Sequence, residues 1–244
     1  MELGKETINT ILDLKRPETL QIEDLQFIRT DYREVQTPTP STLKVGTLDA
    51  IVEFIKRSPD KLDRTKILVH VESPTTVSLF SEVLEPFKNR ATYLEAEYEP
   101  KIQLDKQMGV EAFIVYLQTQ FEMDEELLKV IETCSKVTDV RELEVSDSGV
   151  SQGINLKAGV ITKAESKIKN PVTLKPRRSF PEISQVPCEL VFRIIKNGDN
   201  LNMVLMEADG GLWKLDAVKA IKYYLDSCLN SDIKENEKPI AIIG

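Results

Sequence analysis

The C-terminal stretch from Pro187 to Leu229 restricts the fold more than any other part of the chain. Polar and apolar residues alternate from Glu189 to Lys196, which predicts a strand, and the mostly apolar run Leu201–Glu207 predicts a second strand buried on both faces. Residues 197–200, Asn-Gly-Asp-Asn, are typical of a tight turn because Gly and Asn tolerate positive φ. A helix is expected at Leu212–Leu229, and we expect this strand–turn–strand–helix unit to nucleate the core.

Apolar residues at three- and four-residue spacings predict the positions of the helices. In the C-terminal helix these residues are Leu215, Val218, Ile221, Leu225 and Cys228. Further helices are expected at residues 1–15, 48–56, 109–121 and 125–136, with stripes of Leu48, Ile51, Val52 and Ile55 in the second and of Leu127, Leu128, Ile131 and Cys134 in the last. Thr47 and Asp124 stand directly before two of these helices, where their side chains can cap free amides.

Runs with period-two character predict the strands. They lie at residues 66–72, 77–84, 91–98, 138–145 and 151–162, with a further hairpin around Glu23-Asp24 and a short terminal strand at 239–243 that docks on the sheet or on another subunit. Most of these strands follow one another in turn-linked pairs and do not alternate with helices. We therefore expect the α+β class, with antiparallel sheets, about four helices and a C-terminal β-hairpin plus helix.

Changes of pattern along the chain predict three parts. Residues 1–41 comprise an N-terminal helix and strands with a Pro-containing linker, and residues 42–137 form an α+β subdomain that ends in a helical hairpin. Residues 138–244 form a β-rich subdomain with the C-terminal helix. Within the last part, residues 163–187 are basic and interrupted by four prolines, so we expect an extended excursion or edge strands there.

Composition and charge limit the classes of function. The net charge of −8 argues against a general binder of duplex DNA, which needs a basic face to neutralise phosphates. The three cysteines, Cys134, Cys188 and Cys228, are odd in number and far apart, so neither a disulfide framework nor a zinc site is expected. We expect a cytoplasmic protein with no secretory signal and no membrane span.

The sequence contains no motif that predicts catalysis. His70 is the only histidine, so a metal site built on several histidines is excluded, and no phosphate-binding glycine motif is present. We therefore expect no enzyme activity, no catalytic residue, no metal and no cofactor. The stretch from Glu207 to Gly211 holds two acids and two glycines before the last helix, and either binds a cation or places Asp209 as a helix cap.

The best candidate for ligand binding is a local excess of basic residues. It comprises Lys163, Lys167, Lys169, Lys175, Arg177 and Arg178. We predict that Lys175, Arg177 and Arg178 face solvent or a partner and form the best anion site of the chain, with Phe180 as a stacking face. Extended backbone would put Lys175 and Arg177 on one face and Arg178 on the other. The alternative is that this loop is merely solvated.

Three stretches together resemble a family of uncharacterised phage and prophage proteins of bacteria, known as a domain of unknown function. These stretches are residues 46–52 (GTLDAIV), 174–183 (LKPRRSFPEI) and 207–214 (EADGGLWK), and the resemblance extends roughly over residues 42–229. It implies a phage gene product made in the bacterial cytoplasm. It implies no particular activity.

Two hypotheses about function follow. In the first, the protein is non-enzymatic and acts by self-association, as a homo-oligomer, and by binding a host or phage protein; its acidic balance and two terminal segments able to reach a neighbour favour this. In the alternative, it binds a nucleotide or nucleic acid through residues 163–178, as a recombination accessory or to sequester a host signalling nucleotide.

Overall fold

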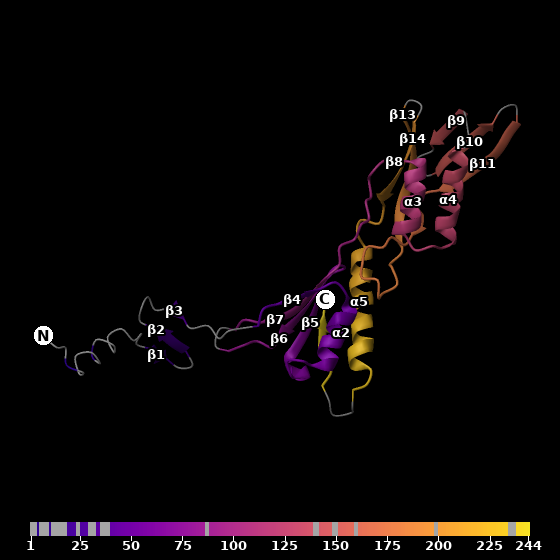
Figure 1. Cartoon of the computed structure of the whole chain (residues 1–244). Helices are drawn as coiled ribbons and strands as arrows, with labels where there is room; N and C mark the ends of the chain where they lie inside the picture. Colours follow the sequence, from indigo (N-terminus) through magenta and orange to yellow (C-terminus); the bar gives the residue numbers. More distant parts are fainter. Residues whose placement is uncertain are drawn as a thin grey trace.

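We describe the fold from a computed structural model. It describes residues 40–85, 88–138, 142–147, 151–158, 161–197, 200–233 and 238–244, with short pieces at 4, 10, 19–22, 25–28 and 33–34. In these residues four α-helices accompany a five-stranded, a four-stranded and two three-stranded sheets (Figure 1). Most strand pairs are antiparallel, so the expected α+β class is confirmed. Of the predicted N-terminal helix at residues 1–15, only residues 4 and 10 are described, so this prediction lies almost wholly outside the described residues.

The first lobe is built on the five-stranded sheet. Its strands lie in the order β15 (Ala241–Ile243), β5 (Ile67–Ser73), β6 (Thr76–Ser81), β7 (Thr92–Glu97) and β4 (Leu43–Val45). The three central strands pair antiparallel, whereas both edge strands pair parallel to their neighbours. Helices α2 (Leu48–Arg57) and α5 (Trp213–Asn230) pack on one face of this sheet.

The helices of the first lobe form as their sequences dictate. The Thr47 side chain accepts a hydrogen bond from the Ala50 amide at 3.3 Å, which caps α2, and the four predicted stripe residues of α2 are buried. In α5 the prediction is partly wrong, since Leu215 is 62% exposed. Instead, the helix buries Ala217, Ile221, Leu225 and Leu229. These buried residues begin and end later in the helix than the predicted stripe.

The second lobe is built on the four-stranded sheet. Its strands lie in the order β12 (Val172–Leu174), β13 (Cys188–Asn197), β14 (Asn200–Glu207) and β8 (Met108–Gly109). The helical hairpin of α3 (Val110–Gln120) and α4 (Glu125–Thr138) packs against it, and Phe113, Leu117 and Phe192 lie in the shared core. Asp124 caps α4 as predicted, because its carboxylate accepts from the Leu127 amide at 2.9 Å. Leu128 is 47% exposed, contrary to expectation.

Two small sheets complete the described residues. One contains β9 (Glu142–Asp147), β10 (Ser151–Ala158) and β11 (Ile161–Lys169), and the other contains β1 (Thr19–Ile22), β2 (Leu25–Ile28) and β3 (Arg33–Glu34). The hairpin predicted around residues 23–24 is confirmed by the antiparallel pairing of β1 with β2. The single strand predicted over residues 151–162 is wrong, since β10 ends at Ala158 and β11 returns antiparallel beside it. β11 and β12 are both edge strands, as expected for the basic stretch.

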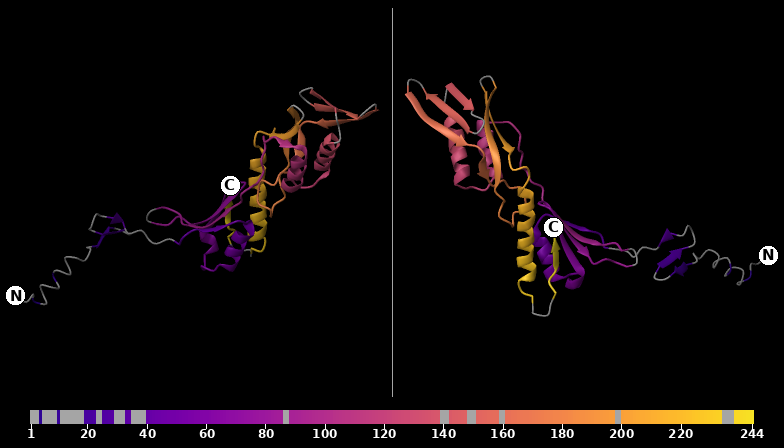
Figure 2. Two further views of the ribbon diagram at one scale, coloured as in Figure 1. Left: turned by 45° about the horizontal axis from the view of Figure 1, so that its top comes forward. Right: turned by 180° about the vertical axis from the view of Figure 1, so that it is seen from behind.

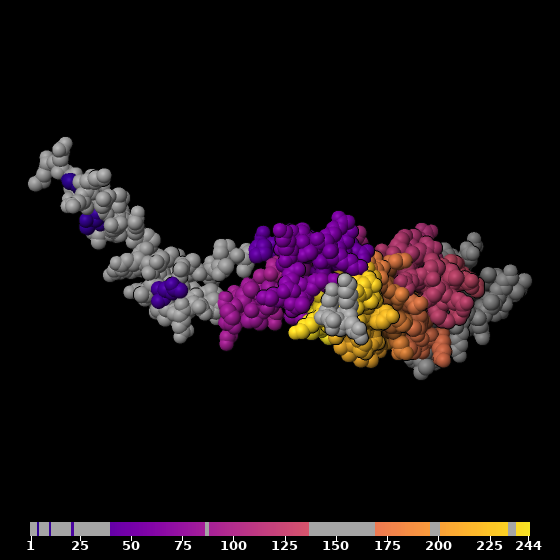
Figure 3. Space-filling model, turned by 90° about the horizontal axis from the view of Figure 1, so that it is seen from below, coloured from indigo at the N-terminus to yellow at the C-terminus, as the bar shows by residue number. Residues whose placement is uncertain are grey.

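The C-terminal unit that we expected to nucleate one core contributes to two. The β13–β14 hairpin belongs to the core of the second lobe, whereas most of α5 belongs to that of the first. Figures 1 and 2 show α5 running from the second lobe down into the first, and Figure 3 shows the two lobes adjoining. The boundary predicted at residues 137/138 would place α3 and α4 in one subdomain and strands β12, β13 and β14 in another. In the structure these helices and strands share one core.

The terminal apolar segment packs on its own chain. β15 pairs with β5, and Ile240 just before it is almost fully buried. The side chain of Asn230 at the end of α5 accepts from the Ile240 amide at 2.9 Å and donates to the Ile240 carbonyl at 3.2 Å. Of the two places expected for this segment, the structure shows the one on its own sheet.

The core of the second lobe generates a stability prediction. Leu117 is fully buried on α3, so Leu117→Ala should lower the free energy of unfolding by about 2–5 kcal/mol. Val115 lies two residues away on the same helix and is 57% exposed, so Val115→Ala should change it by less than about 0.5 kcal/mol. Chemical denaturation of both variants checks this, and equal losses would contradict the assignment of the buried face.

Candidate functional site

The segment that the sequence marks as the best binding candidate lies where the two lobes meet. We call residues 175–187 the junction segment. Its prolines prevent a regular helix, and it follows β12 as irregular chain. It is tied to the loop between α3 and α4, since the Arg177 amide donates to the Gln120 carbonyl at 2.8 Å and the Glu122 amide donates to the Lys175 carbonyl at 2.9 Å.

Gln185 holds the junction segment in a compact turn. Its buried side chain accepts from the amides of Arg178 and Ser179 at 3.0 and 3.1 Å. The amide nitrogen of the same side chain donates to the carbonyls of Ser179 and Phe180 at 3.3 and 3.1 Å. Buried irregular backbone needs such partners, because unpaired amides and carbonyls destabilise the folded state. This one side chain therefore replaces the hydrogen bonds that a helix or sheet would supply.

Arg178 reaches from the junction segment into the second lobe. The residue is 6% exposed, and its Nη1 lies 2.8 Å from the Glu207 carboxylate at the end of β14. Its guanidinium carbon lies 3.9 Å from the ring centroid of Trp213, the first residue of α5. Burial raises the pKa of the neighbouring Cys188 thiol to about 11, although the Arg178 charge opposes the shift. Arg178 is thus a buried cation paired with the protein's own carboxylate and aromatic ring, while its Nη2 has no hydrogen-bond partner among the described residues.

The next residues of the segment enter the first lobe. Phe180 is fully buried with its ring 5.9 Å from that of Tyr98, and Ile183 packs in the same core. The Ser179 hydroxyl donates to the Pro74 carbonyl in the turn between β5 and β6 at 2.5 Å. Consecutive residues 178 and 179 therefore bind to different lobes, and the segment joins them.

Glu182 caps a helix from the other end of the chain. One oxygen of its carboxylate accepts from the amides of Leu48 and Asp49, at 2.7 and 3.2 Å, in the first turn of α2. A carboxylate is favoured there because the first amides of a helix have no partner within it and the helix dipole is positive at that end. This contact secures the segment to the first lobe at a second point.

The structure does not gather the predicted site residues on one surface. The Lys175 side chain is 39% exposed with its ammonium 3.9 Å from the Asp124 carboxylate, and Arg177 is exposed. Arg178 and Phe180 are buried, so the prediction that all three cations are exposed is wrong for Arg178. Arg177 is exposed whereas Arg178 is buried, so the two arginines do not share a surface. The apolar residues Phe180 and Ile183 are the sequence signal that could have indicated burial of this segment. No residue close to Arg178 in the sequence indicates that Glu207 pairs with it.

The other candidate residues have structural roles. Asp209 accepts from the Gly211 and Trp213 amides at 3.0 and 3.4 Å, so it caps the start of α5 as one interpretation predicted. Gly210 and Gly211 have φ of 62° and 84°, which other residues rarely adopt. His70 is half-buried on β5, with its Nδ1 3.9 Å from the Glu72 carboxylate. Within the described ranges, no three His, Cys, Asp or Glu residues are grouped so that they could hold a metal ion.

Comparisons of the chain with protein-family models, with curated proteins and with solved structures find no match. None of the helices in the described residues is long and apolar enough to cross a membrane.

The junction segment predicts a large difference between two adjacent arginines. Arg178→Ala removes a buried side chain that pairs with Glu207 and stacks on Trp213; because the Glu207 side chain is 34% exposed and water can solvate its carboxylate, the free energy of unfolding should fall by about 2–3 kcal/mol. Arg177→Ala removes an exposed charge and should change it by less than about 0.5 kcal/mol. Thermal melting followed by Trp213 fluorescence measures both, since Trp213 lies under the Arg178 guanidinium. Similar melting of the two variants would show that the ion pair does not hold the lobes.

The cysteines predict an order of chemical labelling. All three are free thiols, and burial raises the pKa of Cys134 to about 12 and that of Cys188 to about 11, whereas Cys228 is only half-buried. Because the thiolate is the reactive form, Cys228 should react first with a thiol reagent at pH 8, and the other two only after unfolding. Mass spectrometry of labelled peptides checks this; early labelling of Cys188 would indicate that the junction opens.

Proposed function

We propose that the protein acts without catalysis, by self-association and by binding a second protein of a phage or its bacterial host in the cytoplasm. The resemblance of three stretches to phage proteins supports the setting. The observation that carries the proposal is an exposed apolar stripe on α5, which has no partner among the described residues of the chain.

The α5 stripe consists of Leu212, Leu215 and Tyr223, which are 65%, 62% and 78% exposed. Leu215, Lys219 and Tyr223 follow at four-residue intervals, and Leu212 precedes Leu215 by three, so all four lie on one side of the helix. The buried residues of α5 lie on the opposite side, against the sheet. Large apolar side chains aligned on an exposed helix face are typical of protein interfaces.

A second copy of the chain is the partner that best fits this stripe. Asp216, Lys219, Lys222 and Asp226 flank or interrupt it, so the face carries two acids and two lysines. A balanced face does not repel its own copy. A two-fold axis would place the same surface on both sides of the contact, as in most homodimers.

The alternative function loses support from the site. A phosphate grip was expected from Arg177 and Arg178 together with stacking on Phe180, but Arg178 pairs with Glu207 and Phe180 is buried. Among the basic residues of this segment whose side chains the structure describes, Lys169 and Arg177 are exposed and Lys175 is partly exposed beside Asp124. Charges without a stacking surface favour weak, nonspecific contact.

The α5 stripe gives a direct test of self-association. Light scattering at micromolar concentration should show an oligomer for the unaltered chain. Replacing Leu215 and Tyr223 by Glu should weaken its association at least about tenfold, because each exposed apolar contact is replaced by a charge. Leu128→Glu, at an exposed leucine on α4 in the second lobe, is the matched control and should leave association unchanged. A monomeric unaltered chain would refute the proposal.

A further inference from the structure

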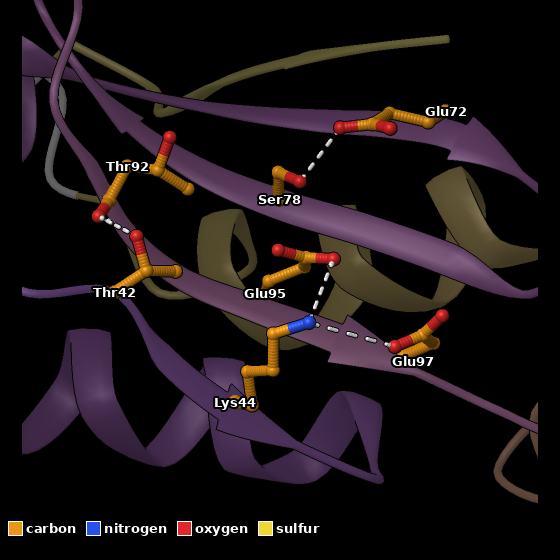
Figure 4. A network of polar contacts seen from close by, with 7 residues as sticks. All are labelled: Thr42, Lys44, Glu72, Ser78, Thr92, Glu95 and Glu97. Carbon is orange, nitrogen blue, oxygen red and sulfur yellow. Dashed lines mark hydrogen bonds and ion pairs between the residues drawn. The ribbon is translucent and has the colours of Figure 1, made fainter.

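The open face of the five-stranded sheet is the second surface without a partner in the described part of the chain. α2 and α5 both lie behind the sheet in Figure 4, and the side chains in front of it come from β4, β5, β6 and β7. The face opposite the helices would ordinarily carry a mixture of polar residues throughout. Here the strand registers sort the side chains into rows that cross the strands.

The first row is apolar at its centre. Leu68 on β5 pairs with Phe80 on β6, and β15 adds Ala241 beside Leu68. Leu68 and Phe80 are half-buried, whereas their neighbours on the helix-covered face, Val69 and Leu79, are fully buried. On β15, Ile243 pairs with His70 one row further along and is 47% exposed. One end of the face therefore exposes apolar surface to solvent.

The following rows become acidic toward the opposite end. Ser78 pairs with Glu95, and Thr76 pairs with Glu97. Glu72 on β5 joins them, since its carboxylate accepts from the Ser78 hydroxyl at 2.7 Å (Figure 4). Each of these three carboxylates thus lies on the same side of the sheet.

Among the ion pairs of the described residues, one lysine lies near two of these three carboxylates. The Lys44 ammonium lies 3.9 Å from Glu95 and 4.0 Å from Glu97, and its side chain is 71% exposed (Figure 4). Exposed ion pairs at this distance stabilise little, because water screens both charges. The acidic end therefore keeps a net negative charge that a basic partner can neutralise.

We infer that this face binds a basic amphipathic segment of the partner protein, with its apolar residues over Leu68 and Phe80 and its lysines or arginines over Glu72, Glu95 and Glu97. The inference rests on the proposed function and names the chemistry of its partner. A helix laid across the strands fits the spacing. Phe80 lies four residues from Thr76, the partner of Glu97, so the apolar row and the last acidic row are roughly 13 Å apart. A helix with its side chains is about 10–12 Å wide, and long lysine side chains extend its reach.

The charge of the face selects among possible occupants. A second copy would bring the same carboxylates and be repelled, so self-association belongs to the balanced α5 stripe. A nucleic acid would be repelled for the same reason. A partner with both apolar and basic residues gains contacts at both ends of the face.

Synthetic peptides test the inference with the full chain. The probe is an amphipathic helix of about 18 residues made of leucine and lysine, and its counterpart carries glutamate in place of lysine. The lysine peptide should bind, with affinity falling as salt is added, and the glutamate peptide should not. Failure of the lysine peptide to bind the folded protein would overturn the inference.

Matched variants separate this face from the overall negative charge. Replacing Glu72, Glu95 and Glu97 by Gln should weaken binding of the lysine peptide at least about tenfold. Replacing three exposed helical acids, Glu53, Glu126 and Glu132, by Gln changes the net charge equally and should leave binding unchanged. Equal losses in the two variants would show general attraction to an acidic protein and would overturn the inference. Thermal melting confirms that each variant is folded.

The α5 variant distinguishes failure of this inference from failure of self-association. The chain with Leu215 and Tyr223 replaced by Glu should bind the lysine peptide as tightly as the unaltered chain. If the unaltered chain binds the lysine peptide but does not self-associate, the inference about the sheet face stands and the proposed self-association through the α5 stripe is wrong. If the α5 variant lost peptide binding while still folded, the peptide would bind at α5, and the inference would be wrong.

Discussion

The ion pair between buried Arg178 and partly exposed Glu207 anchors the junction segment, which joins the two lobes. A guanidinium taken out of water destabilises the fold unless a carboxylate and further contacts replace its hydration, and Glu207 and Trp213 replace part of it. Once Arg178 is held against the second lobe, the next residues of the chain have little freedom. Phe180 and Ile183 then enter the core of the first lobe. The ion pair in the second lobe thereby positions Phe180 and Ile183 for burial in the first lobe.

Polar side chains make this irregular crossing possible. Gln185 satisfies the backbone within the junction segment, and Glu182 satisfies the first amides of α2. Neither interaction requires regular secondary structure within the junction segment, where the prolines at 176, 181 and 187 prevent a helix. The basic segment that we predicted to be an anion site thus mainly joins the two lobes. Surfaces for binding a partner are therefore sought on the outside of the lobes.

Both lobes follow the same plan, in which helices cover one face of a sheet. In the first lobe this plan leaves two exposed surfaces of different character. The α5 stripe is apolar with balanced charge, which suits a second copy of the chain. The open sheet face is apolar at one end and acidic at the other, which suits a basic amphipathic partner. Because the two surfaces lie on opposite sides of the sheet, one chain could use both at once.

Local pattern in the sequence determined most of the elements. Thr47 before an apolar stripe predicted α2, the turn around residues 23–24 predicted the pairing of β1 with β2, and Asp124 predicted the start of α4. These signals act between residues at most a few positions apart, where helix spacing, strand alternation and capping are decided. The prediction of Asp209 as a cap succeeded for the same reason.

Only the tertiary structure decided which elements share a core and which charges are buried. Arg178 pairs with a residue 29 positions away and Glu182 caps a helix 133 to 134 positions away, and neither contact leaves a local signal. The same holds for α5, which follows the β13–β14 hairpin in sequence but packs in the other lobe. A sequence pattern states that a face is apolar, whereas the partner of that face is selected by the packing of the whole chain.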